Sequence, residues 1–353
     1  MNQDRSKMLQ QRVLNSAKTS RPLQIQGGGS KRFLGHTTNT ALLDVSGHCG
    51  IVSYDPVELV ITARAGTPLR KIEQTLSEAN QMLPFEPPHF GLNATLGGTI
   101  ACGLSGPSRS FNGSARDYVL GVKIINGRGE ILNFGGQVMK NVAGYDCSRL
   151  MAGAMGTLGV ILEVSLKVLP KQAAEVTLIN QASPSQALET MTYWSGKSLP
   201  LSAAAYDGEN CYLRLSGAKT AVESAQTLIG GEPHPNSHDF WRAVKEHQHP
   251  FFQSERPLWR LSLPAEIPPI DIPGEWFIDW CGAQRWLLSE SSAEEIRELA
   301  HQAGGHATLF RHGSSDTTTF QAPSDGIMQL HRRLKQAFDP AGIFNPGRLY
   351  PGL

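Results

Sequence analysis

Residues 94–109 read Ala-Thr-Leu-Gly-Gly-Thr-Ile-Ala-Cys-Gly-Leu-Ser-Gly-Pro-Ser-Arg, a segment made almost wholly of glycine and small side chains. Such side chains leave backbone N–H groups open to close approach by a ligand, as the binding of a diphosphate requires. Two other segments are also rich in glycine and small side chains. Residues 27–30 (Gly-Gly-Gly-Ser) follow a strand-like stretch, and residues 153–161 lead into another strand-like stretch. One such segment alone is typical of a tight turn, but three together predict a bound dinucleotide.

The sequence lacks the motifs of two common types of nucleotide-binding site. No Gly-x-Gly-x-x-Gly opens a helix after a strand, so a Rossmann-type nicotinamide site is not expected. No Walker lysine follows the glycine segments, which argues against a phosphate-binding P-loop.

Length and charge set further limits. The chain has 353 residues, enough for two domains with separate cores. Its 32 Lys and Arg residues balance 31 Asp and Glu residues, so nucleic acid is not an expected partner. The cysteines are scattered without a Cys-x-x-Cys pair, which excludes an iron–sulfur cluster held by this chain and suits a reducing compartment. Neither a secretory signal nor an apolar run of about 20 residues is visible, so we expect a cytoplasmic protein with at most peripheral membrane contact through a complex.

The first half of the chain is rich in predicted strands. Stretches rich in Val, Ile and Leu predict strands at 23–26, 41–44, 59–63, 119–125 and 159–169. A helix is expected to begin with Thr67 as its cap and Pro68 as its first residue. Residues 125–131 predict a hairpin with a glycine-rich tip.

After Pro170 helices alternate with strands. Helices are expected at 185–195, at 220–229, and from a capping box of Ser292 and Glu295 to the glycines at 304–305. Strands are expected at 203–206, 211–215, 258–263, 276–280, 285–288 and 306–311. Residues 234–249 predict a long loop, and a further helix ends at the Asp-Pro of 339–340. This order predicts a second α+β domain.

The order of five segments is specific. They are Gly-Gly-Gly-Ser at 27–30, Ala-Thr-Leu-Gly-Gly at 94–98, Arg-Asp-Tyr-Val-Leu-Gly at 116–121, the stretch 144–160, and Phe-Asn-Pro-Gly-Arg at 344–348. This succession resembles the vanillyl-alcohol-oxidase-type FAD-binding family, also named after p-cresol methylhydroxylase (PCMH). Within that family, residues 82–89, 138–145 and 304–308 give a closer likeness to the FAD-binding E subunits of bacterial glycolate oxidases.

The resemblance implies an α+β fold, in which a two-subdomain PCMH-type FAD-binding domain carries a smaller α+β cap domain. On this basis the FAD-binding domain is expected at 1–170 and the cap domain at 171–327. Residues 328–353 are expected to form a C-terminal segment that returns to the FAD-binding domain.

The resemblance also implies the residues that bind FAD. The diphosphate is expected to bind to Gly27, Gly28, Gly29, Ser30 and Lys31, and the other side of the cofactor to be lined by Thr95, Gly97, Gly98 and Thr99. Gly103 and Gly106 are expected near the flavin, and Gly159 and Val160 at the adenosine. Lys140, Asn345 and Arg348 are candidates for the flavin edge that becomes negative on reduction, although Arg348 could instead tie the C-terminal loop to the domain by a salt bridge. No histidine stands beside the diphosphate loop, so dissociable, non-covalent FAD is expected.

As to activity, the resemblance implies a subunit that assists a D-type flavoprotein subunit and an iron–sulfur F-type subunit in oxidising glycolate to glyoxylate. Two alternatives stay open: a self-sufficient flavin oxidoreductase of a small alcohol or 2-hydroxy acid, and a non-catalytic scaffold that retains FAD. No catalytic residue is assigned, because the His-x-His constellation of the D subunit has no counterpart here; Arg285, His89 and His306 are candidates by elimination. No metal site is expected, since the histidines of 234–249 lack a fixed helical spacing.

Overall fold

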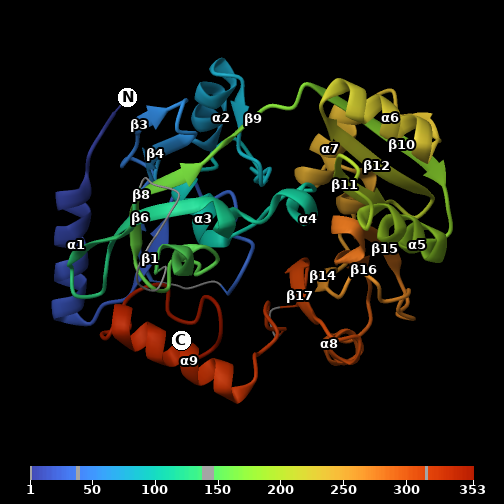
Figure 1. Cartoon of the computed structure of the whole chain (residues 1–353). Coiled ribbons are helices and arrows are strands. Elements are labelled where there is room, and N and C mark those ends of the chain that lie inside the picture. The colour runs from blue at the N-terminus through green and yellow to red at the C-terminus, as the bar shows by residue number, and fades with distance from the viewer. Residues whose placement is uncertain (1, 37–39, 137–146, 315–316) are drawn as a thin grey trace. The chain divides into compact units, whose positions relative to one another are not determined.

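A computed structural model describes residues 2–36, 40–136, 147–314 and 317–353, which form two compact units (Figure 1). Unit 1 comprises Met1–Leu104, Ser114–Pro170 and Ala322–Leu353. Unit 2 comprises Ser105–Gly113 and Lys171–Gln321.

Unit 1 is built around a five-stranded antiparallel sheet in the order β3-β4-β8-β6-β7. Its strands are β3 (Ile51–Asp55), β4 (Val60–Arg64), β6 (Val119–Ile125), β7 (Ile131–Gly135) and β8 (Val160–Lys167). The short strands form a parallel pair, β1 (Leu23–Gln26) with β2 (Ala41–Asp44), and an antiparallel pair, β5 (Gln81–Met82) with β9 (Leu169–Pro170). The helices are α1 (Ser6–Thr19), α2 (Leu69–Glu78), α3 (Leu96–Cys102) and α9 (Asp325–Phe338), with 3-10 turns at η1 (Ala115–Tyr118) and η2 (Cys147–Met151).

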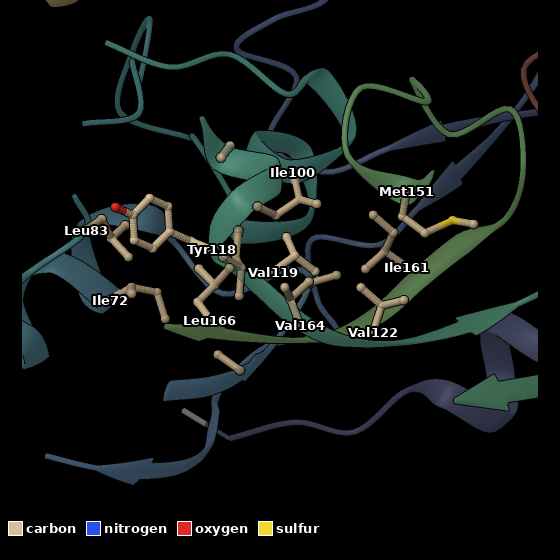
Figure 2. Packing of buried hydrophobic residues seen from close by; sticks show 14 of the residues in the cluster. Ile72, Leu83, Ile100, Tyr118, Val119, Val122, Met151, Ile161, Val164 and Leu166 are labelled. Carbon is tan, nitrogen blue, oxygen red and sulfur yellow. The ribbon is translucent and has the colours of Figure 1, made fainter. Parts of the chain in front are cut away.

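The core of unit 1 lies between this sheet and the helices α2 and α3. Val164 and Leu166 of β8 pack in one cluster with Ile72 of α2 and Ile100 of α3 (Figure 2). All four side chains are fully buried. Since burying one such side chain stabilises the fold by about 1.5–3 kcal/mol, the cluster fixes α3 on the sheet.

Unit 2 contains an eight-stranded sheet in the order β13-β10-β12-β11-β15-β16-β14-β17, with antiparallel neighbours throughout. The strands are β10 (Ala174–Gln181), β11 (Leu201–Tyr206), β12 (Asn210–Gly217), β13 (Glu232–Pro233), β14 (Leu258–Ser262), β15 (Glu275–Asp279), β16 (Gln284–Leu288) and β17 (His306–Arg311). The helices are α4 (Arg109–Asn112), α5 (Pro184–Ser195), α6 (Lys219–Ile229), α7 (Ser237–Lys245) and α8 (Ala293–Gln302), with turns η3 (Pro250–Gln253) and η4 (Trp280–Gly282).

The α+β class is confirmed, and the strands and hairpins expected from the sequence form within a few residues of their predicted bounds. Two local expectations are wrong, and one helix was missed. The predicted loop at 234–249 contains α7, whose Phe240, Trp241 and Val244 are buried. Thr67 does not cap α2, because its hydroxyl donates to the carbonyl of Gly50 instead. In addition, α1 lies in a segment where no helix was expected.

The division into units also differs from the expected domain bounds. Residues 105–113 were expected in the FAD-binding domain, yet they belong to unit 2. The indole Nε1 of Trp280 donates to the carbonyl of Gly106 (2.9 Å), and Phe111 packs on the core of unit 2. The return to unit 1 begins at Ala322, earlier than the expected residue 328. Within the described ranges, no helix is both long enough and apolar enough to traverse a bilayer.

Candidate functional site: a backbone-lined pocket in unit 1

Unit 1 contains a pocket of about 840 Å³, part of it open to solvent. Four stretches of chain form its wall: residues 24–32 along and after β1, the first turns of α3, residues 155–161 at the start of β8, and the C-terminal loop. Among the described residues that line it, none is Asp or Glu. The wall therefore combines glycine backbone, neutral side chains and a few cations.

The loop after β1 approaches the neighbouring segment so closely that side chains have no room. A Cβ on Gly28 would lie 1.4 Å from the carbonyl oxygen of Asn93, and a Cβ on Gly27 would lie 2.3 Å from Oγ1 of Thr95. Glycine is thus a steric requirement at both positions. The close approach brings bare main chain to the wall of the pocket.

This loop presents a run of free donors. Within the described parts of the chain, the amides of Gly27, Gly28, Gly29 and Ser30 donate to no acceptor. Backbone N–H groups that are partly withdrawn from water nearly always have a partner. Consecutive amides around a left-handed residue, here Gly29 with φ +72°, form a concave anion-binding nest. The loop is therefore suited to the oxygens of a diphosphate.

The second glycine segment, residues 94–109, gives the pocket space at the start of α3 but no free backbone N–H donors there. It forms the helix α3, with Thr95 as its N-cap. The amides of Leu96 and Gly97 donate to the carbonyls of Thr67 and Ala65, and that of Gly98 donates to Oγ1 of Thr95. These donors are already occupied, which differs from the sequence-based picture of a second open phosphate loop.

Glycine is nevertheless needed at the start of α3. A Cβ on Gly97 would lie 2.6 Å from the Cβ of Ala65, so the helix can rest on β4 only without it. Thr95, Gly97 and Gly98 line the pocket, whereas Thr99 is buried beneath it with its hydroxyl lacking a partner among the described residues.

Three cations stand in the pocket wall, and two of them, Lys31 and Arg348, are buried. The side chain of Lys31 is 7% exposed and its ammonium donates to the carbonyl of His89 (3.2 Å). Arg348 is 9% exposed, and burial lowers the pKa of its guanidinium. No carboxylate pairs with Arg348 among the described residues. Because a buried guanidinium is costly without a carboxylate partner, Arg348 favours a negatively charged ligand in the pocket.

Arg348 also joins two parts of the wall. Its Nη1 donates to the carbonyl of His36 (2.9 Å), and its Nη2 donates to those of Leu34 (2.6 Å) and Arg32 (3.1 Å). It therefore ties the C-terminal loop to the glycine loop through carbonyl oxygens, and not by the salt bridge considered from the sequence.

Asn345 has a similar bridging role. Its Oδ1 accepts from the amide of Ile25 (2.7 Å), and its Nδ2 donates to the carbonyl of Met155 (2.6 Å). Behind it, the ammonium of Lys335 contacts Asp339 (2.8 Å) and the carbonyl of Phe344 (2.7 Å). The C-terminal loop is thus fixed against both β1 and the segment before β8.

The structure separates the remaining expected residues. Gly159 lines the pocket, whereas Val160 is fully buried in β8 and does not. Gly103 ends α3 in the left-handed conformation, and Gly106 belongs to unit 2. Neither of them lines the pocket. Lys140 lies outside the described residues.

Several lining residues were missed from the sequence, and Cys102 is the one among them that carries a thiol. Cys102 follows Gly98 by one helical turn, so this spacing on α3 could have placed its thiol at the pocket. Burial raises the pKa of that thiol, and the charges of Lys31 and Arg348 act in the opposite direction. The group is therefore held as a neutral thiol in the pocket wall.

Two residues considered for substrate chemistry are engaged elsewhere. Arg285 is 1% exposed and donates to the carbonyls of Gly282 (3.2 Å) and Pro268 (2.8 Å), so it serves the interior of unit 2. The ring of His89 makes a 2.9 Å hydrogen bond with Glu73.

The pocket fits the diphosphate part of FAD, since it combines free amides, steric glycines and buried cations. Residues 6–135 match the FAD binding domain family, and residues 279–349 match the C-terminal domain of the FAD linked oxidases. A solved structure of alkyldihydroxyacetonephosphate synthase aligns with a TM-score of 0.68 at 16% identity, covering 96% of this chain and 75% of that one. This likeness concerns the fold.

Two curated relatives are informative. The glycolate oxidase subunit GlcD of Bacillus subtilis (strain 168) is 32% identical over 129 residues, which are 36% of this chain and 27% of the relative. The glycolate oxidase subunit GlcE of Escherichia coli (strain K12) is 48% identical over 350 residues, which are 99% of both chains. The chain therefore belongs to the family of the glycolate oxidase subunit GlcE.

Proposed function

We propose that this chain is the FAD-binding E subunit of a glycolate oxidase that converts glycolate to glyoxylate, and that the pocket of unit 1 holds the cofactor non-covalently. The run of free amides at residues 27–30, in a pocket with buried cations and no acidic side chain, is the observation that carries the proposal. The match to the FAD binding domain family and the full-length likeness to GlcE support it.

The proposed roles follow from the pocket. The loop from Gly27 to Lys31 binds the diphosphate, and the start of α3 leaves room for it. Gly159 lies on the side proposed for the adenosine, whereas Val160, which is buried in β8, is not assigned a contact with it. Asn345 and Arg348 fix the wall, and Arg348 also supplies positive charge. We assign unit 1 as the FAD-binding domain and unit 2 as the cap domain.

FAD, when bound, supplies a hydride acceptor that passes electrons onward one or two at a time. The chain's own residues bind the cofactor, orient it and shield it from water. Lys31 and Arg348 favour a negative charge in the pocket, because opposite charges interact strongly where water is excluded.

The activity is proposed to need partners. We infer that a D-type flavoprotein subunit carries the main oxidation and that an iron–sulfur F-type subunit accepts electrons. The similarity to both GlcE and GlcD supports a multi-subunit glycolate oxidase. The complex is proposed to lie in the cytoplasm, peripheral to the inner face of the cell membrane.

The experiment compares the purified chain, the D- and F-type subunits without it, and the three together, in an assay of glycolate oxidation with an artificial electron acceptor. We expect turnover by the three together and none by the isolated chain. Robust turnover by the isolated chain would instead establish a self-sufficient oxidoreductase. Turnover of the complex during which this chain's FAD is never reduced would establish a scaffold.

A further inference from the structure

One face of the sheet in unit 2 carries an arginine without a counter-ion. Side chains alternate between the faces of a strand, and Trp259 and Leu261 of β14 pack with α8, which lies beside β17 (Figure 1). Arg260 and Ser262 therefore lie on the opposite face. In the strand register, Arg260 stands between Trp286 of β16 and Thr308 of β17.

The guanidinium of Arg260 has no hydrogen bond or ion pair with any residue in the described ranges, and its Nε is fully buried. Its guanidinium lies over the ring of Phe310, 5.9 Å from the ring centroid. Burial, followed by the charge of Arg109, lowers the pKa of Arg260 to about 10. The arginine is thus both desolvated and uncompensated.

The other titratable groups around this face are mostly bases. Burial and the charge of Arg260 lower the pKa of His306, which stands opposite Ser262 on β17. Burial, Arg311 and Arg260 lower the pKa of His247 well below its usual value. The arginine charges thus disfavour protonation of both histidines, so the cluster repels added positive charge.

The nearby carboxylates are committed to other groups. Glu275 pairs with Arg256, and Asp279 accepts from the amide of Trp280 and from Gln284. A buried cation that lacks an internal anion is expensive to keep, and clustered bases add to the cost. A bound anionic ligand would offset the free-energy cost of burying the Arg260 guanidinium.

We propose that Arg260 is the anchor of a binding site for a small carboxylate on this face of unit 2, with His306, Ser262 and Thr308 as neighbouring hydrogen-bonding groups. The planar guanidinium matches a carboxylate in a bidentate geometry, which a single ammonium cannot do. Hydroxyl and imidazole groups beside it suit the oxygen on the second carbon of a 2-hydroxy or 2-oxo acid. The choice of glycolate and glyoxylate as ligands rests on the proposed function, whereas binding of a carboxylate does not.

The test is a titration of the purified full chain with glycolate, glyoxylate and the neutral analogue ethylene glycol, without added FAD. Isothermal calorimetry gives the affinity, and tryptophan fluorescence reports locally because Trp286 adjoins Arg260. We expect both carboxylates to bind and the neutral diol to fail. Arg260→Met should weaken carboxylate binding by about 10- to 100-fold, the usual worth of a charge-assisted hydrogen bond.

Two variants keep the result interpretable. Arg256→Met removes an arginine that is paired with Glu275, and it should leave carboxylate binding unchanged. Arg260→Lys keeps the charge and should restore part of the affinity, so a folding defect in Arg260→Met does not leave the question open. Unchanged affinity in both Arg260 variants, or equal binding of the diol, would overturn the site. Failure of FAD uptake alone would overturn the proposed function and leave this site standing.

Discussion

At the scale of single residues, the account depends on glycines that are sterically required. Gly28 has no space for a side chain, because Asn93 lies against it, and the amides around it are left free for a ligand. Gly326 in α9 provides a contrast, since a Cβ there would meet no atom within 4 Å. The same chemical change at the two positions therefore has different consequences.

Gly28→Val should abolish FAD binding, or weaken it by at least about 100-fold, because the loop must move away from Asn93 and carry its amides with it. The FAD content after reconstitution, read from flavin absorbance per chain, is the measurement. Gly326→Val is the matched control and should bind FAD as the wild type does. Full occupancy in Gly28→Val would contradict the role assigned to this loop.

At the scale of elements, α1 illustrates how a polar segment is held in place. Leu9 and Val13, one turn apart, are fully buried. The imidazole Nδ1 of His48 accepts from the amide of Arg5 (2.9 Å), just before the helix begins. His48 is itself fully buried, with Asp4 near its ring. Docking of α1 thus depends on a neutral histidine.

This dependence predicts a loss of stability at acidic pH. Burial lowers the pKa of His48 below its usual value of 6.5, and the opposing effect of Asp4 is smaller. The unfolded chain therefore binds more protons than the folded chain in this range. The contribution of His48 is present above about pH 6.5 and is lost as the pH falls through the folded-state pKa.

We expect Tm to fall between about pH 7.5 and about pH 5.5, with faster hydrogen exchange in α1. His48→Asn keeps an acceptor but does not titrate, so its Tm should fall less over the same interval. His238→Asn changes a histidine whose side chain is 87% exposed and should behave as the wild type. Equal pH dependence in His48→Asn and the wild type would refute the role of His48.

The elements show what a single sequence can and cannot predict. The strands β6 and β8 are rich in Val, Ile and Leu, and both were located from their residues alone. The helix α1 buries only Leu9 and Val13, and they pack with residues of β1 and β2. Its polar sequence does not indicate that these strands will cover the two side chains. The helix α7 was missed because prolines and histidines on its flanks suggested a loop, while its apolar residues are confined to one face.

The site was predictable in part for similar reasons. The glycine loop could be recognised from its local composition, because its backbone amides donate to no other part of the described chain. The use of the α3 amides by Ala65 and Thr67 depends on packing across the fold, so composition could not distinguish a helix start from an open loop. That Arg260 lacks a hydrogen-bond partner for its buried Nε can be seen only when its neighbours in space are known.

At the scale of the whole molecule, the chemistry is divided between two units. Unit 1 has the features of a cofactor pocket, which are free amides and buried cations. Unit 2 has an uncompensated arginine on one face of its sheet, and Arg285 in its interior is satisfied by carbonyls. This division agrees with a subunit that holds a cofactor and depends on partners for turnover.

The most direct measurement is the titration of the purified, cofactor-free chain with FAD, followed by flavin absorbance and by the quenching of flavin fluorescence. The account predicts one FAD bound per chain, released on denaturation because no covalent bond forms. A chain that remains colourless and leaves FAD fluorescence unchanged throughout the titration would contradict the central claim that the pocket of unit 1 binds this dinucleotide.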